Sequence, residues 1–190
     1  MPRIRSLTTT ALLLTGMSLN AHAITIMPSP PQLDNKAYVL MDFESGQVLA
    51  ASNPDEHLPP ASLTKMMTSF IVEQKLMAGQ IKEDEPVRMN ESAWCHGSSS
   101  ESCMYVPLNG NATVLEMLRG IIIQSGNDAS KAVAEHIAGN EGAFAELMNA
   151  EAQRLNMKNT HFMNATGLPM EGHYSSAGDM SLLARAIIHD

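Results

Sequence analysis

Residues 113–138 read TVLEMLRGIIIQSGNDASKAVAEHIA, and this stretch decides the fold class. Apolar residues recur three and four positions apart on both sides of the Ser-Gly pair at 125–126, which is the periodicity of amphipathic helices. Thr113 is followed three residues later by Glu116, the spacing of a capping box at a helix start. The stretch therefore predicts two consecutive helices, one beginning at Thr113 and one over 127–138, with a break between them.

Outside this stretch, the same periodicity predicts more helices, and the residues ahead of them predict strands. The further helices are expected over 62–78, 141–156 and 176–189, the last beginning at Ser176 or Gly178. Residues 37–42 and 46–50 have the composition of two strands, joined by a hairpin at Phe43-Glu44-Ser45. A hairpin followed by several helices indicates an α+β domain built in layers. Because two strands make a very small sheet, we expect further strands to complete it.

Composition limits the classes of protein to which the chain can belong. It has 190 residues, of which 44% are apolar, and this suits one globular domain with a sizeable core. A formal net charge of -8 excludes the basic surface that nucleic-acid binding needs, so we expect no nucleic-acid partner. The 15 methionines are expected to fill an irregular core. A proline-containing stretch over 24–36 is expected to be an extended lead-in to a domain over 37–190.

The amino terminus has the pattern of a secretory signal. Arg3 and Arg5 precede an apolar run at 11–19, and the small-residue triplet Ala21-His22-Ala23 follows it. The run is too short to span a bilayer as a helix, so we expect residues 1–23 to be cleaved on export; a buried amino-terminal helix is the alternative. Cleavage would remove two of 12 basic residues and none of 20 acidic ones, which leaves a formal charge of -10.

Export to an oxidising compartment would affect the two cysteines, Cys95 and Cys103, which have only seven residues between them. Oxidising compartments allow disulfides to persist, so we expect the two thiols to pair and to shape the loop between them. The alternative is a metal site built from Cys95, His96 and Cys103, which lacks a fourth ligand and the usual paired spacing. We therefore expect no metal and no cofactor.

Two short motifs can carry chemistry. Ser62-Leu63-Thr64-Lys65 places a hydroxyl and an amine on one face of a predicted helix start, which suits a nucleophile beside its base. Ser125-Gly126-Asn127 lies in a break between helices, where Ser125 could relay a proton and Asn127 could bind substrate. Each motif is weak alone. The alternatives are a helix cap at Ser62 beside a solvated Lys65, and a Gly126 that simply ends a helix.

Four stretches together carry a resemblance that neither motif carries alone. They read PASLTKMMT at 60–68, IIIQSGNDA at 121–129, NATGLP at 164–169 and GHYSSAGDM at 172–180. In this order they resemble the serine D-alanyl-D-alanine carboxypeptidases, the low-molecular-mass penicillin-binding proteins of the type of penicillin-binding proteins five and six. The resemblance covers about residues 37–190 and implies a β-lactamase/transpeptidase-like domain with α/β/α layers.

By this resemblance Ser62 would attack the terminal D-alanyl-D-alanine bond of a peptidoglycan stem peptide and form an acyl-enzyme. Lys65 would be the general base, Ser125 would pass a proton to the leaving amine, and Asn127 would hold the substrate or Lys65. β-Lactam antibiotics would acylate the same serine. The protein would act in the periplasm, at the outer face of the inner membrane.

The sequence also departs from the family pattern, because it contains no Lys-Thr-Gly. In the family this motif, the strands that close the sheet, a β-domain and an amphipathic membrane helix lie farther along the chain. We therefore expect an incomplete domain without its closing strands, and poor folding of residues 24–190 alone because sheet edges would be open. The alternatives are a catalytically incomplete peptidoglycan-binding fragment and, disfavoured by Gly126 and Gly167, a serine β-lactamase. The cysteine pair is not part of the general pattern.

Overall fold

The structure is a computed structural model that describes residues 29–96 and 101–189. The chain divides into two compact units, Met1–Gln32 and Leu33–Asp190, and every element described here belongs to the second unit. Residues 29–36 are exposed and contain no helix or strand. The signal peptide expected over residues 1–23 lies outside the described residues.

All the helices predicted from periodicity are present, and their ends differ from the expected ones by at most two residues. The elements in chain order are β1 (Tyr38–Met41), β2 (Val48–Ser52), the 3-10 turn η1 (Ala61–Leu63), α1 (Thr64–Met77), β3 (Pro86–Arg88), β4 (Asn111–Thr113), α2 (Val114–Gln124), α3 (Asn127–Ala138), α4 (Glu141–Arg154) and α5 (Ala177–His189). Among the described helices, none is long and apolar enough to cross a membrane.

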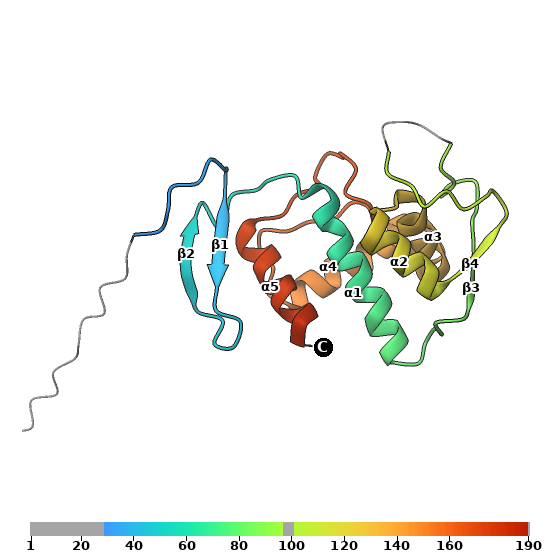
Figure 1. Ribbon diagram of the computed structural model, residues 1–190, viewed down its shortest axis with the longest axis horizontal. Coiled ribbons are helices and arrows are strands. Elements are labelled where there is room, and N and C mark those ends of the chain that lie inside the picture. The colour runs from blue at the N-terminus through green and yellow to red at the C-terminus, as the bar shows by residue number, and fades with distance from the viewer. Residues whose placement is uncertain (1–28, 97–100, 190) are drawn as a thin grey trace, which may run out of the picture. The chain divides into compact units, whose positions relative to one another are not determined.

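The predicted hairpin is confirmed as the antiparallel pair β1–β2, in which Tyr38 lies opposite Ser52. Asp42 closes the turn, because its backbone bonds to Gln47 and its carboxylate accepts a hydrogen bond of 2.9 Å from the Ser45 amide. Helix α5 packs against β1 (Figure 1). The Arg185 side chain fixes this contact, since its Nε donates to the carbonyl of Phe43 at 2.7 Å.

A second antiparallel pair, β3–β4, lies at the far side of the helices from the hairpin (Figure 1). The sequence Val-Arg-Met at 87–89 predicts a short extended piece near β3, but nothing in the sequence predicts a strand at β4. Each strand has three residues, which is too short for an alternating pattern to be recognised. β4 ends at Thr113, which then caps α2: its hydroxyl accepts from the Glu116 amide at 3.2 Å, and the Glu116 carboxylate accepts from the Thr113 amide at 2.8 Å. The predicted capping box is confirmed.

The buried core consists of two clusters, and α1 and α3 contribute side chains to both. Val72 of α1 and Val133 of α3 belong to the cluster that also includes β3 and α2. Phe70 of α1 and Ala134 of α3 belong to the cluster with α4 and α5. Methionines fill both clusters as expected, and those with no exposed surface are Met67, Met89, Met117 and Met148. Because α1 packs against all four other helices, its first turn is held firmly in place.

Candidate active site

Ser62 lies in the 3-10 turn η1, directly before α1, and its side chain is exposed. The predicted helix started at this serine, whereas the α-helix begins at Thr64. No side-chain hydrogen bond caps either helix start, so the interpretation of Ser62 as a helix cap is wrong. The turn runs straight into the helix, and it therefore keeps Ser62 on the same side as Lys65: Nζ of Lys65 lies 3.5 Å from Oγ of Ser62.

Lys65 is buried rather than solvated, with 5% of its surface exposed. Its ammonium group donates a hydrogen bond of 2.7 Å to the carbonyl oxygen of Thr166. Burial disfavours the charged amine and lowers the pKa of Lys65 to about 8, while the negative charge of Glu101 acts in the opposite direction. A lysine with such a pKa releases its proton near neutral pH, which a base for a serine hydroxyl must do.

The partner of Lys65 belongs to a rigid loop over residues 164–168. Oδ1 of Asn164 accepts hydrogen bonds from the amides of Thr166 and Gly167, at 3.1 and 2.7 Å. Its Nδ2 donates to the carbonyl of Leu168 at 2.9 Å, which closes the loop on itself. The loop also accepts from α1, because the Thr68 hydroxyl donates to the carbonyl of Ala165 at 2.8 Å. These bonds fix the Thr166 carbonyl in the position from which it holds Lys65.

Gly167 lets this loop approach the backbone beside Ser62. Its φ angle is +83°, and a Cβ atom built on it would lie 1.8 Å from the carbonyl oxygen of Ala61. No side chain fits in that space. Ala61 itself has a positive φ of 46°, so the residue ahead of Ser62 is held in a conformation that L residues rarely adopt.

His173 and Asp179 hold the corner that leads into α5. The His173 ring lies 2.8 Å from the Thr64 hydroxyl through Nε2, and its Nδ1 accepts from the Met163 amide at 2.9 Å. Burial lowers the pKa of His173, so the neutral ring is favoured. Asp179, in the first turn of α5, accepts from the Asn159 amide at 2.6 Å. Both residues are thus structural partners of the loop around the site.

Ser62, Lys65 and Ser125 come together in one cavity of about 410 Å³. The rest of its lining is mostly apolar and comes from α1, α2 and α5: Met66, Ser69, Phe70, Glu73, Met77, Ile121, Ile122 and Ile187. Ser125 enters the cavity from the break between α2 and α3, where its φ is 54°. Gly126 has an ordinary φ of -62°, so the serine and not the glycine adopts the left-handed conformation that ends α2. The interpretation of Gly126 as the residue that ends this helix is therefore wrong.

Asn127 does not line this cavity. It is the first residue of α3, 6% of its surface is exposed, and its backbone amide donates to the Ser102 carbonyl at 2.8 Å. Of the two residues expected to act from this turn, Ser125 therefore lines the cavity and Asn127 does not.

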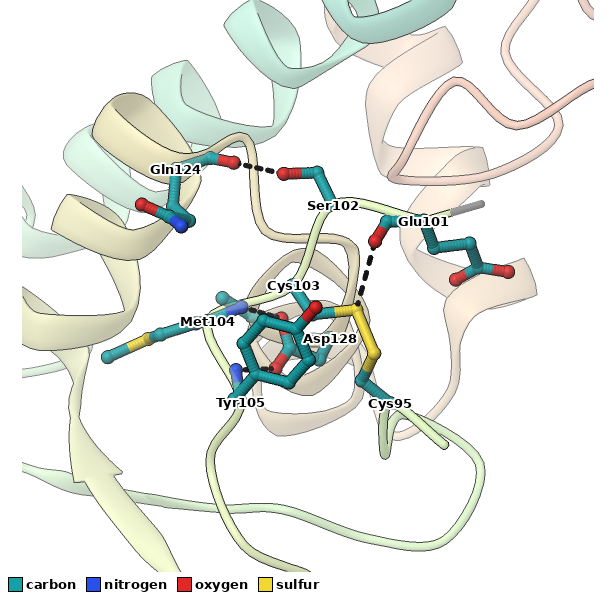
Figure 2. The surroundings of a disulfide bond; sticks show 9 residues. Cys95, Glu101, Ser102, Cys103, Met104, Tyr105, Gln124 and Asp128 are labelled. Atoms are coloured by element: carbon teal, nitrogen blue, oxygen red, sulfur yellow. Dashed lines mark hydrogen bonds between the residues drawn. A yellow bond between two sulfur atoms is a disulfide. The ribbon is translucent and has the colours of Figure 1, made fainter. Parts of the chain in front are cut away.

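The expected disulfide between Cys95 and Cys103 is present (Figure 2). It excludes the alternative metal site, because both thiols are consumed in the bond. Among the described residues, no group of three or more His, Cys, Asp or Glu side chains could hold a metal ion. Residues 101–105, which include Cys103 of the disulfide, lie against the turn between α2 and α3. Asp128, in the first turn of α3, accepts hydrogen bonds from the amides of Met104 and Tyr105 in this segment (Figure 2).

Three residues of this site were not identified from the sequence: Thr166, Glu101 and Asp128. Thr166 acts through its backbone carbonyl, which no sequence pattern reveals. Glu101 acts on Lys65 from 36 positions farther along the chain, so only folding brings the two together. Asp128 directly follows Asn127 in the quoted stretch, and an acidic residue in the first turn of a helix was the one available signal.

Comparisons with known proteins agree with this geometry. A family model described as D-alanyl-D-alanine carboxypeptidase matches residues 24–190. D-alanyl-D-alanine carboxypeptidase DacA of Escherichia coli K12 is 42% identical over 98% of this chain, which covers 48% of that protein. DacC of the same organism is 44% identical over 84% of this chain and 41% of its own length. The chain thus spans about half the length of the curated relatives it matches.

Solved structures show the same likeness in three dimensions. Penicillin-binding protein 5 from Haemophilus influenzae superposes with a TM-score of 0.84 and 45% identity, over 86% of this chain and 48% of that one. Penicillin-binding protein 6B from Escherichia coli gives a TM-score of 0.82 and 38% identity, over 89% of this chain and 54% of that one. The expected β-lactamase/transpeptidase-like fold of the penicillin-binding proteins is confirmed for the part of that fold that this chain covers.

Proposed function

Because the chain belongs to the D-alanyl-D-alanine carboxypeptidase family, we propose that it supplies the serine machinery that removes the terminal D-alanine from peptidoglycan stem peptides. The observation that carries this proposal is the buried Lys65, whose Nζ lies 3.5 Å from the Ser62 hydroxyl oxygen. A distance slightly longer than an ideal hydrogen bond is usual in a site without substrate. An acyl transfer needs a nucleophilic serine, a base that takes its proton and a cavity that holds the substrate, and Ser62, Lys65 and the cavity they line can supply these three.

In the first step Ser62 is the nucleophile and Lys65 the general base. Neutral Lys65 takes the proton from Oγ as Oγ bonds to the carbonyl carbon of the penultimate D-alanine. The Ser62 backbone amide, in the first turn of η1, would stabilise the negative charge on the carbonyl oxygen as one donor of an oxyanion hole. The hydrogen bond to the Thr166 carbonyl keeps the amine in place while it gains the proton.

In the second step the bond to the terminal D-alanine breaks. Ser125, which lines the same cavity, passes the proton from Lys65 to the leaving amine, so that neutral D-alanine amine departs and Lys65 is again neutral. Asn127, at the start of the adjoining helix and outside the cavity lining, would hold the substrate or Lys65 in place. Water then hydrolyses the acyl-enzyme with Lys65 once more as base, which frees the shortened peptide and restores Ser62.

The partners and location follow from this chemistry. A β-lactam ring presents a strained amide to Ser62, so these antibiotics would acylate it and act as covalent inhibitors. Peptidoglycan lies outside the cytoplasm, and the signal-like residues 1–23 support export to the periplasm. We place the protein at the outer face of the inner membrane.

A fluorescent penicillin tests the proposal on the protein expressed from its complete reading frame. We expect one covalent label, at Ser62, and release of D-alanine from a synthetic peptide ending in D-alanyl-D-alanine. Ser62→Ala should abolish both signals, whereas Ser92→Ala, a control on the exposed surface near Glu135, should retain them.

The remaining outcomes of this experiment would support one of the alternatives or contradict the proposal. A stable label without D-alanine release would support the binding-fragment alternative. Rapid turnover of the penicillin would support a β-lactamase. An unlabelled Ser62 in folded protein would contradict the proposal altogether.

A further inference from the structure

Two segments meet at the Lys65 amine: the first turns of α1 and the loop over 164–168. Lys65 donates to the Thr166 carbonyl at 2.7 Å, and one turn farther along α1 the Thr68 hydroxyl donates to the Ala165 carbonyl at 2.8 Å. Both bonds start on α1 and end on the loop. The position of the amine therefore depends on how closely the loop is held to the start of α1.

His173 makes a third connection between α1 and this loop, although it belongs to neither of them. Its Nε2 lies 2.8 Å from the hydroxyl oxygen of Thr64, the first residue of α1, which directly precedes Lys65. Its Nδ1 accepts a hydrogen bond of 2.9 Å from the amide of Met163, the residue directly before the loop. One imidazole ring thus bridges the two segments whose separation decides the Lys65 bond.

The bond from Met163 decides which nitrogen of the His173 ring carries the proton. A backbone N–H can only donate, so Nδ1 must offer a lone pair, and in the neutral ring Nε2 then donates to the Thr64 hydroxyl oxygen. A protonated ring has an N–H on both nitrogens and cannot accept from Met163. The bridge therefore requires the neutral ring, and burial and the nearby His161 both lower the pKa of His173 in its favour.

Packing and backbone bonds hold the His173 ring in this position. Only 8% of the residue is exposed, and the Phe162 ring lies edge-on against it with 5.9 Å between the ring centroids. The His173 amide donates to the Met170 carbonyl at 3.1 Å. The next residue, Tyr174, is paired with His161 by backbone bonds of 2.9 and 3.0 Å. The bridge thus starts from a fixed backbone.

The Thr64 side chain carries the effect of the bridge to the loop itself. Thr64 has no exposed surface, and its hydroxyl oxygen would lie 2.9 Å from a Cβ atom built on Gly167. Gly167 directly follows Thr166, whose carbonyl binds the Lys65 amine. A shift of the Thr64 side chain would therefore change the contact with the loop one residue away from that carbonyl.

We propose that His173 is a positioning residue: its neutral ring bridges α1 and the residue ahead of the loop over 164–168, and so holds the loop where the Thr166 carbonyl binds the Lys65 amine. The proposal rests on the proposed function of Ser62 and Lys65. His173 is not one of the residues that line the cavity, so it acts only through the contact between α1 and the loop.

Three substitutions of His173 separate the two bonds. His173→Phe keeps a ring and loses both bonds. His173→Asn places an oxygen near the position of Nδ1 and keeps an acceptor for the Met163 amide, whereas His173→Gln places an amide nitrogen near Nε2 and keeps a donor to Thr64. In folded protein expressed from the complete reading frame, the Phe variant should react with a fluorescent penicillin at Ser62 roughly tenfold more slowly, and the other two should lie in between.

Hydrogen exchange of the Thr166 amide, measured by nuclear magnetic resonance, reports on the loop. This amide bonds to Oδ1 of Asn164, and in the Phe variant it should exchange roughly tenfold faster, with partial recovery in the Asn and Gln variants. The matched control is His136→Phe on α3, a histidine that lies 2.9 Å from the Glu85 carboxylate and has no bond to the loop, and it should change neither measurement.

A role in stability alone would leave both measurements unchanged in the folded protein. Acylation within about twofold of the unaltered rate in the folded Phe variant would therefore overturn the proposal, and so would unchanged exchange of the Thr166 amide. A ¹⁵N spectrum that places the ring proton of His173 on Nδ1 would overturn it as well. If the Phe variant does not fold, the Asn and Gln variants, which each keep one bond, provide the same comparison.

Hydrogen exchange needs no acylation, so it also separates this proposal from the proposed function. Faster exchange at Thr166 in the His173 variants of a protein that no penicillin labels would support the bridge and contradict the serine chemistry. Unchanged exchange in variants that are labelled normally at Ser62 would contradict the bridge and leave the serine chemistry supported.

Discussion

Lys65 is the residue whose surroundings decide the chemistry of the site. The interior around it favours the neutral amine, whereas Glu101 and the Thr166 carbonyl favour the protonated one. The first effect dominates, and the pKa of Lys65 falls from the usual lysine value of 10.5 to about 8. At pH 7 roughly a tenth of the molecules therefore carry a neutral base, compared with fewer than about one in a thousand for a solvated lysine.

We predict that acylation of Ser62 rises with pH through about 8 and then levels off. Below that pH the neutral amine is the scarce species, so the rate should increase nearly tenfold per unit of pH. Stopped-flow or gel-based measurement of penicillin acylation checks this. A rate that is constant from pH 6 to 9, or that rises only above 10, would show that Lys65 is not the base.

Gly167 offers a second prediction for a single residue. Gly167→Ala should lower the free energy of unfolding by about 3 kcal/mol or more, because its positive φ disfavours a side chain and its Cβ would strike the Ala61 carbonyl. Gly79→Ala is the control: it has a φ of +66° but nothing within 4 Å of the added atom, so it should cost only about 1 kcal/mol. Urea denaturation measures both. Equal losses would mean that the loop does not approach Ala61 closely.

Among the elements, the loop over 164–168 does the most to position the base. Asn164 is 3% exposed, and its side-chain oxygen accepts from the Thr166 amide, the Thr166 hydroxyl and the Gly167 amide. Gly167 and Pro169 in the sequence favour a loop between the helices here. The sequence does not indicate that a single side chain holds the turn together, because the same residues form many kinds of loop.

Asn164→Ala should destabilise the fold by about 2–4 kcal/mol, since it leaves buried donors without an acceptor. It should also slow acylation of Ser62, because the Thr166 carbonyl is then free to move away from Lys65. Asn164→Asp keeps the acceptor oxygens but loses the Nδ2 donor to the Leu168 carbonyl, so its stability and its acylation rate should lie between those of the unaltered protein and of the Ala variant. The outcome that contradicts this account is an Asp variant as impaired as the Ala variant in thermal unfolding and penicillin labelling.

Elements with long apolar periodicity were the ones that could be predicted. Helices α2 and α3 have the expected bounds, since each repeats its pattern over three turns and begins with a recognisable cap or break. The 3-10 turn at Ser62 and the three-residue strand β4 could not be recognised. Neighbouring elements impose both conformations, and a few residues have no periodicity of their own.

For the molecule as a whole, the distribution of exposed apolar side chains is unusual. Leu40 and Val48 of the hairpin are 57% and 49% exposed, and Ile122, Ile123 and Ile188 on the helices are 63%, 79% and 67% exposed. Each sheet in the described residues also has only two strands, so its outer edges have no strand partner there. Surfaces and edges of this kind favour association.

We predict that a polypeptide of residues 24–190 alone binds the dye ANS and self-associates at micromolar concentration. The physical reason is the exposed apolar surface and the open strand edges. Fluorescence and analytical ultracentrifugation measure the two effects, with the protein from the complete reading frame as the control. A monomer that does not bind the dye and unfolds in one sharp transition would contradict the prediction.

The sequence by itself determined the helices, the hairpin, the disulfide and the pair Ser62 and Lys65, because each depends on residues close together in the chain. Only the tertiary structure decided that Lys65 is buried, that a carbonyl 101 positions away binds its amine, and that Glu101 opposes the effect of burial. It also left Asn127 outside the cavity that Ser125 enters. Burial and electrostatic environment arise from contacts between distant segments, and no local pattern encodes them.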